Sequence, residues 1–297
     1  MLTRSEKNKK EINKVERSKK IKKGFKIFKI VFLLILMVIC FLLYSRYIST
    51  YGFEVREYSK VYDNLPKEYH GLKIVQISDI YYGNTTFKKE LKTLKNEINK
   101  LKPDILVFTG DLVSSGYNLS DNEKEYIINT FNDIFTSIGK FSVLGDLDNE
   151  ESINILKKSN FNILNNTSEL IYKDTTTPLY INGISSTIKD EAHIVSAFEN
   201  NNKNIFTITL MHETNSIDEI LNNYNTDIIM AGHSRNGQIR LPLIGGLLKS
   251  KNSNKYNDFY YHKENTDIYI SGGIGTKTIP FRLFNRPSIN LYRLRSK

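Results

Sequence analysis

Three short apolar segments in the first half of the chain, each followed within two residues by an aspartate, constrain its fold most strongly. The segments are Leu72–Ser78, Asp104–Thr109 and Phe141–Leu144, and the aspartates are Asp79, Asp111 and Asp146. Their length and branched apolar side chains are typical of buried strands. Helical spacing of apolar residues over Lys88–Leu101 and a second helical pattern over Asn122–Ile138 fill the intervals between them. This alternation of strand and helix predicts a parallel α/β sheet.

The second half of the chain also has short apolar segments followed by possible ligands, but it contains more strand than helix. Ile205–Leu210 leads to His212, and Asp227–Met230 leads to His233. Further strand-like segments are Leu179–Ser185, Gln238–Leu241, Ile268–Ser271 and Ile289–Leu294. We therefore expect a second sheet that packs on the first. Residues 47–70 are mixed and polar, which favours a stalk that leads into a first edge strand, before a main domain over residues 71–297.

The net charge of +10 belongs almost entirely to the amino terminus. The first 29 residues hold 12 of the 42 Lys and Arg and 3 of the 32 Asp and Glu, a net of +9. The rest of the chain is therefore nearly neutral, and its charge gives no reason to expect a nucleic-acid partner. A single cysteine, Cys40, excludes an intrachain disulfide and a cysteine-based zinc site.

The segment Ile30–Tyr44 contains no charged residue. A helix of this length spans roughly 22 Å of the ~30 Å hydrocarbon core, and preceding apolar residues extend it, while Lys26 and Lys29 can reach the headgroups. We expect a basic cytoplasmic tail over residues 1–29 and a transmembrane signal anchor over 30–46, with the main domain on the extracytoplasmic side of the cell membrane. A cleaved signal peptide is the alternative, but the basic region is long and no small-x-small cleavage site follows.

Five metal-ligating side chains follow predicted strands: Asp79, Asp111, Asp146, His212 and His233. Carboxyl ends of parallel strands meet at one edge of a sheet, so we expect these side chains to converge. Neighbouring carboxylates repel unless a cation neutralises them, and carboxylate with imidazole suits Mn²⁺, Fe or Zn²⁺. Any one of them alone is equally compatible with a helix cap, a turn or a satisfied polar group. Together they favour a metal or phosphate site.

The same residues carry a resemblance to a known family. The motifs Asp79-Ile80-Tyr81, Gly110-Asp111, Gly145-Asp146-Leu147-Asp148, His212 and Gly232-His233-Ser234-Arg235 occur in the order of the calcineurin-like metallophosphoesterases, whose pattern is D-x-H, G-D, G-N-H-[DE], H and G-H-x-H. The resemblance covers about residues 53–297 and includes the ending SGGIGTKTIPFRLFNRPSIN, which is similar to the membrane-anchored bacterial branch. It implies a four-layer α/β/β/α sandwich, preceded here by one transmembrane helix, and two metal ions bridged by one aspartate.

The resemblance breaks mainly at the first metal position. The family's ligands there are two aspartates and two histidines. Asp79 and Asp111 are present in this chain, but Tyr81 and Arg235 stand where the histidines belong. The histidine that assists the leaving group is replaced by Leu147, which has no proton to donate. The family's dimetal site is therefore expected to be degenerate.

The second metal position is better retained. Its ligands by resemblance are Asp111, His212 and His233, with Asp146 in place of the family's asparagine. We expect these four residues to hold one divalent ion, Mn, Fe or Zn, although a site without any ion is the alternative. Asp79 is then a remnant of the first site, and Arg235 and Tyr81 either replace the lost ion or bind a substrate phosphate.

Two functions remain open. The first is hydrolysis of phosphoester or pyrophosphate bonds with one metal site, on a phosphorylated small molecule or a lipid headgroup beside the membrane that holds the anchor. The second is a catalytically inactive phosphoesterase-fold protein that binds a phosphorylated ligand or a partner. Because Leu147 stands at the general-acid position, no catalytic residue can be assigned from the sequence.

Overall fold

The computed structural model describes residues 4–189, 192–247 and 250–297, and the chain divides into two units, Met1–Ile48 and Ser49–Lys297. The first unit is helix α1 (Arg4–Leu43), which continues into a π-helical turn, η1 (Tyr44–Ile48). The stretch Glu16–Ile48 is a candidate membrane span by its length and composition, and its apolar side chains are exposed. Residues 1–3 of the predicted basic tail lie outside the described residues.

The second unit contains two six-stranded sheets. The order in the first is β1-β14-β2-β3-β4-β5, in which β2 to β5 run parallel and β14 is antiparallel to β2. Edge strand β1 pairs in parallel with β14. The bounds are β1 Glu54–Tyr62, β14 Ser288–Ser296, β2 Leu72–Ile77, β3 Ile105–Phe108, β4 Gly139–Ser142 and β5 Phe161–Ile163.

The second sheet has the order β12-β13-β9-β8-β7-β6, with four parallel central strands and an antiparallel strand at each edge. Its bounds are β12 Tyr260–Lys263, β13 Thr266–Ile270, β9 Ile228–Ala231, β8 Thr207–Leu210, β7 Leu179–Gly183 and β6 Thr167–Ile171. A small hairpin, β10 (Arg240–Leu241) with β11 (Gly245–Gly246), follows β9.

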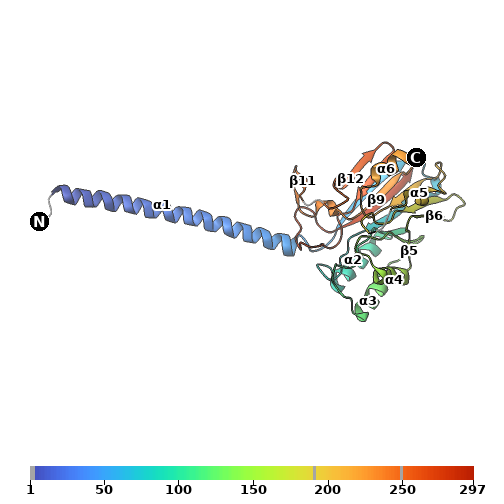
Figure 1. Ribbon diagram of the computed structural model, residues 1–297, viewed down its shortest axis with the longest axis horizontal. Helices are drawn as coiled ribbons and strands as arrows, with labels where there is room; N and C mark the ends of the chain where they lie inside the picture. The colour runs from blue at the N-terminus through green and yellow to red at the C-terminus, as the bar shows by residue number, and fades with distance from the viewer. Residues whose placement is uncertain (1–3, 190–191, 248–249) are drawn as a thin grey trace. The chain divides into compact units, whose positions relative to one another are not determined.

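Three apolar cores, formed by residues that the structure describes, hold the layers together. Alternate residues of β2 serve different cores: Ile74 packs between the two sheets, and Val75 packs under the helices. Helices α2 (Lys88–Leu101), α3 (Asp121–Asn132) and α4 (Glu150–Lys158) cover the outer face of the first sheet and lie together in Figure 1. Helices α5 (Ile194–Phe198) and α6 (Ile217–Asn223) cover the second sheet. The four-layer α/β/β/α prediction is confirmed.

One predicted helix was too long. The pattern over Asn122–Ile138 predicted a single helix, but α3 ends at Asn132. The following residues bond instead to the last turn of α2 and to the α2–β3 connection: the Phe135 N–H donates to Asn99, and the Ile138 N–H donates to the carbonyl of Asp104. Strand β4 accordingly starts at Gly139, two residues before the predicted Phe141. Helices α4, α5 and α6 and strands β5, β6 and β12 were not predicted.

Candidate metal site

The candidate site forms where strands of both sheets end. Asp79 and Asp111 follow β2 and β3 of the first sheet, and His212 and His233 follow β8 and β9 of the second. Asp79, Asp111 and His233 have positive φ of 52°, 63° and 57°. This left-handed conformation costs a non-glycine residue on the order of 1–3 kcal/mol, and such strain concentrates at functional sites.

The glycines of the motifs allow the loops to approach one another. A Cβ on Gly145 would lie 2.3 Å from Asp111 Oδ1, and a Cβ on Gly232 would lie 2.1 Å from Ser78 Oγ. Both distances are far below van der Waals contact, so a side chain at either position would displace a neighbouring loop. The glycines before Asp146 and His233 are thus steric requirements of the site.

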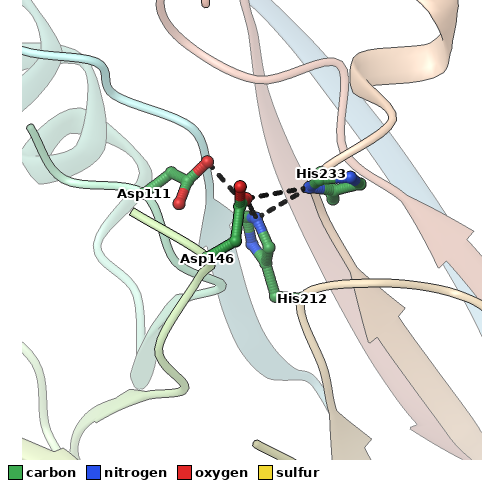
Figure 2. Close-up of side chains that lie close together, drawn as sticks. All are labelled: Asp111, Asp146, His212 and His233. Atoms are coloured by element: carbon green, nitrogen blue, oxygen red, sulfur yellow. Dashed lines mark hydrogen bonds and ion pairs between the residues drawn. The ribbon is translucent and has the colours of Figure 1, made fainter. Parts of the chain in front are cut away.

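Four of the predicted ligands lie together: Asp111, Asp146, His212 and His233 each offer one atom, and these atoms all lie within 4.8 Å of one another. Figure 2 shows the four side chains pointing toward a common centre. His212 Nε2 lies 3.4 Å from Asp111 Oδ2 and 3.5 Å from Asp146 Oδ1. His233 Nδ1 lies 3.3 Å from Asp146 Oδ1.

The outer nitrogen of each imidazole is engaged by a backbone carbonyl. His212 Nδ1 lies 2.5 Å from the carbonyl oxygen of Thr109, and His233 Nε2 lies 2.9 Å from that of Lys251. A carbonyl oxygen can only accept, so these nitrogens carry the hydrogens of the neutral rings. The inner nitrogens, His212 Nε2 and His233 Nδ1, are 3.2 Å apart and turn their lone pairs toward the centre. Fixing the tautomer in this way is characteristic of metal-ligating histidines.

Asp146 supplies a further acceptor with no donor. Its Oδ1 is buried beside the two inner imidazole nitrogens and has no hydrogen-bond partner among the residues that the structure describes. Its Oδ2 accepts a hydrogen bond of 2.8 Å from Lys277 Nζ. An orphaned carboxylate oxygen and two lone-pair nitrogens around one point fit a divalent ion with mixed oxygen and nitrogen ligands.

The pKa shifts also indicate that the cluster favours a positive charge at its centre. Burial acts to raise the pKa of Asp111, but His212 outweighs burial and lowers it. The pKa of Asp146 is also lowered, since His212, His233 and Lys277 outweigh its burial. Burial acts to lower the pKa of His212, yet the neighbouring carboxylates raise it well above its ordinary value. The cluster thus stabilises a cation at its centre, either a proton or a metal ion.

Tyr81 and Arg235 contact the carboxylates of Asp79 and Asp111. Tyr81 Oη lies 2.9 Å from Asp79 Oδ1 and 2.7 Å from Asp111 Oδ2, and Arg235 Nη1 donates to Tyr81 Oη at 2.7 Å. Arg235 Nη1 also forms an ion pair of 3.3 Å with Asp79 Oδ1. All four residues are buried, and Arg235 and Tyr81 lie at positive φ like the aspartates. A guanidinium and a hydroxyl therefore stand between two buried carboxylates.

These contacts shift the pKa of both replacing groups. Burial, together with Asp111 and Asp79, raises the pKa of Tyr81 well above its usual value despite the nearby guanidinium, so its hydroxyl stays protonated. Burial acts to lower the pKa of Arg235, but Tyr81, Asp79 and Asp111 outweigh it and raise the pKa. The Tyr81 hydroxyl has one proton, which reaches one carboxylate at a time. The permanent positive charge beside Asp79 and Asp111 is thus carried by Arg235.

Sequence reasoning did not assign a role to Asp148. Its buried carboxylate accepts hydrogen bonds from the N–H groups of Asp111, Leu112 and Gly145, at 2.8, 2.9 and 2.8 Å. Burial and the charge of Asp111 raise its pKa, which these hydrogen bonds oppose. Asp148 therefore ties the loop after β3 to the loop after β4. Its place in the acidic run Gly145-Asp146-Leu147-Asp148 was the available signal.

Arg282 was also missed, although it is fully buried. It donates to the carbonyls of Gly272, Gly273 and Gly275 at 2.8, 3.1 and 2.6 Å. Burial and the nearby Arg235 lower its pKa to about 9. The loop that it holds lies against the site loop after β2, because the Gly275 N–H donates to the carbonyl of Asp79. Arg282 thus positions the site through the backbone.

Comparisons with known proteins show the family of this chain. The model of the family "Calcineurin-like phosphoesterase" matches residues 72–272. The chain is 24% identical to the uncharacterized metallophosphoesterase YkuE of Bacillus subtilis, over 85% of this chain and 89% of the relative. It is 26% identical to the UDP-2,3-diacylglucosamine pyrophosphatase LpxG of Chlamydia muridarum, over 77% and 86%.

A vertebrate relative is similar too: the transmembrane protein with metallophosphoesterase domain of Danio rerio is 23% identical over 76% of this chain and 54% of the relative. The family uses divalent metal ions to hydrolyse phosphoester and pyrophosphate bonds, and the cluster of Asp111, Asp146, His212 and His233 is a possible site for such an ion. The matched region includes every motif and spans most of both sheets. The chain belongs to the calcineurin-like phosphoesterase family.

Proposed function

We propose that this protein is a membrane-anchored hydrolase of pyrophosphate or activated phosphoester bonds that works with one divalent ion, Mn, Fe or Zn. Asp111, Asp146, His212 and His233 would hold the ion. One observation carries the proposal: both imidazoles direct lone-pair nitrogens toward two carboxylates, because their outer nitrogens are bound to backbone carbonyls. When bound, such an ion polarises a phosphoryl oxygen and lowers the pKa of water.

The rest of the site sets the charge that faces the substrate. Arg235 replaces the family's other ion by neutralising Asp79, and Tyr81 donates to one of the two carboxylates. Lys277, which contacts Asp146 and is 27% exposed, offers a second cation for a phosphate oxygen. Both cations would bind and orient the phosphate through their positive charge.

Leu147 at the general-acid position limits which leaving groups can depart in the proposed hydrolysis. Its N–H donates to Asp111 Oδ1 at 2.9 Å, while its side chain has no proton to give. Alkoxide leaving groups need protonation, whereas a phosphate monoester or a phenolate departs as an anion. Pyrophosphates and aryl phosphates are therefore the expected substrate classes. LpxG, which acts on a pyrophosphate, is a relative that fits this reasoning.

The membrane placement extends the proposal. Residues 1–29 form the basic cytoplasmic tail, 30–46 the signal anchor, 47–70 the stalk and first strand, and 71–297 the catalytic domain. The candidate span and the charge of the tail support this layout, with the main domain on the extracytoplasmic side. A phosphorylated lipid headgroup is then the natural substrate, because the anchor keeps the site near the bilayer.

A second candidate function is favoured by one observation. Tyr81 and Arg235 fill the first metal position, and Leu147 stands at the general-acid position. These replacements also suit a protein that binds a phosphorylated ligand without hydrolysing it. Retention of bound ion and bound pyrophosphate without turnover would identify this function.

The test uses the full chain in detergent with Mn²⁺, assayed on bis-p-nitrophenyl phosphate and on a nucleoside-diphosphate-linked lipid. We expect His212→Ala and His233→Ala to abolish turnover, whereas His193→Ala, a matched change at an exposed histidine, retains it. Turnover that survives both site substitutions would place the activity elsewhere. Leu147→His should raise turnover most on substrates with poor leaving groups, since it restores a proton donor.

A further inference from the structure

The hairpin β10–β11 ends in an exposed apolar tip. Leu243 and Ile244 at its turn have relative exposures of 108% and 70%, and Phe284 in a neighbouring loop is 60% exposed. We propose that this apolar tip, Leu243, Ile244 and Phe284, inserts into the headgroup region of the bilayer that holds the chain's own anchor. The inference rests on the membrane-anchored function proposed above and adds an interaction surface to it.

The three side chains belong to one surface. The Arg240 N–H donates to the carbonyl of Leu283 at 2.9 Å, which joins the base of the hairpin to the residue before Phe284. Leu243, Ile244 and Phe284 also line the same shallow hollow. Leu243 and Phe284 have positive φ of 67° and 48°. Bulky residues rarely adopt this conformation, so the fold presents these apolar side chains to the outside at an energetic cost.

Chain connectivity limits how far this surface can be from the membrane. Arg286, two residues after Phe284, donates from Nη2 to the carbonyl of Tyr51 at 3.0 Å. The candidate span ends at Ile48. Three residues cover at most about 11 Å when fully extended, so Tyr51 cannot lie farther than that from the end of the span. The loop that carries Phe284 is therefore held close to the point where the chain leaves the bilayer.

The residues around the exit are those of a membrane interface. Tyr44, Tyr47 and Tyr51 are exposed, and tyrosines concentrate at the level of the headgroups. Arg286, which donates to the Tyr51 carbonyl, adds a cation that suits anionic lipid phosphates. A wedge of a few apolar side chains next to such a belt is typical of interfacial insertion.

A second copy of the chain fits this surface less well than lipid. A stable protein interface buries about 800 Å² on each partner around a packed centre, and three side chains at a hairpin tip fall short of that. The bilayer has no such requirement, because it accommodates a small protruding apolar group. We therefore assign lipid as the occupant and treat self-association as an outcome of the test.

Insertion of the tip would turn the candidate site toward the membrane surface. The hairpin continues directly from the motif around His233: the Leu247 N–H donates to the carbonyl of Ile239, and Gly246 approaches Gly237 so closely that a Cβ would lie 2.9 Å from its Cα. Hairpin and site loop are therefore in direct contact. A phosphate carried on a lipid headgroup would meet the site without leaving the bilayer.

The chain contains no tryptophan, so a single introduced indole reports its own surroundings. The full chain is reconstituted into nanodiscs of phosphatidylcholine, with or without brominated acyl chains that quench indole fluorescence. Leu243→Trp tests the tip, and Leu36→Trp in α1 tests the anchor. Phe135→Trp is the matched control, because Phe135 is 77% exposed in the loop after α3.

We expect brominated lipid to reduce the emission of Leu243→Trp at least twofold, and that of Phe135→Trp by less than a tenth. Quenching of Leu36→Trp with no quenching of Leu243→Trp would overturn the insertion of the tip and leave the anchor intact. An unquenched Leu36→Trp would overturn both. A blue-shifted but unquenched Leu243→Trp would assign the surface to a second copy of the chain and also overturn the proposal. None of these fluorescence measurements depends on catalytic turnover.

Discussion

Replacing Arg235 by methionine tests whether a side chain has taken over the charge of the lost ion. The guanidinium lies 3.3 Å from Asp79 Oδ1 and donates to the Tyr81 hydroxyl that bridges Asp79 and Asp111. Both aspartates have an exposed fraction of 0%. Removing one partner of a buried ion pair costs about 3–5 kcal/mol, because the remaining charge is left without compensation. Methionine keeps most of the stem's volume, so we attribute the loss mainly to charge.

The measurement is urea unfolding of residues 49–297 at pH 7 with EDTA, which removes any contribution of bound metal. We expect Arg235→Met to lower the free energy of unfolding by about 3–5 kcal/mol and Arg295→Met, at an exposed strand position, by less than about 0.5 kcal/mol. Adding Asp79→Asn to Arg235→Met should restore part of the loss, which a double-mutant cycle measures. A loss below about 1 kcal/mol for Arg235→Met would refute the charge replacement.

Three further predictions concern the scaffold of the site and the start of helix α3. Gly145→Ala should lower the free energy of unfolding by about 1–3 kcal/mol, since its Cβ would meet Asp111 Oδ1; an unchanged urea midpoint would contradict this. Asp148→Ala should cost at least about 3 kcal/mol by leaving three N–H groups without acceptors, and amide exchange at Leu112 should accelerate; normal protection there would count against the role. Hydrogen bonds from Ser120 and Tyr117 lower the pKa of Glu123 to about 2, so its stabilisation is present above pH 4.5 and is lost as pH falls through 2. The difference in urea midpoint between wild type and Glu123→Gln should therefore close between those pH values; a constant difference would exclude the ionic contribution.

The parts of the fold that could be predicted from the sequence are those in which apolar residues form a clear run or a regular repeat. Strand β2 was predicted within a residue from its short run of branched apolar residues, and helix α2 from apolar residues that recur at helical spacing. The end of α3 could not be predicted, since the pattern continues to Ile138 while the competing acceptors, Asn99 and the Asp104 carbonyl, lie on distant residues. Short edge strands such as β6 and β12 carry little periodic signal.

The candidate site could likewise be predicted only in part from the sequence. The convergence of His212 and His233 follows from strand order, because each ends a parallel strand of one sheet. The tautomers do not follow, since the acceptors are backbone carbonyls of Thr109 and Lys251 that no motif marks. The role of Arg282 is equally hidden, because a buried arginine bound only to carbonyls has the same sequence appearance as a surface one.

The metal content of the purified full chain tests the central claim most directly. After saturation with Mn²⁺ and gel filtration, inductively coupled plasma mass spectrometry should find one ion per chain, and none in His212→Ala with His233→Ala. The double substitution Tyr81→His with Arg235→His should bind two, because it restores the replaced ligands and removes the competing cation. One ion in the wild type is the expected result. No ion, or two ions in the wild type with Arg235 in place, would contradict a single metal site beside a side-chain cation.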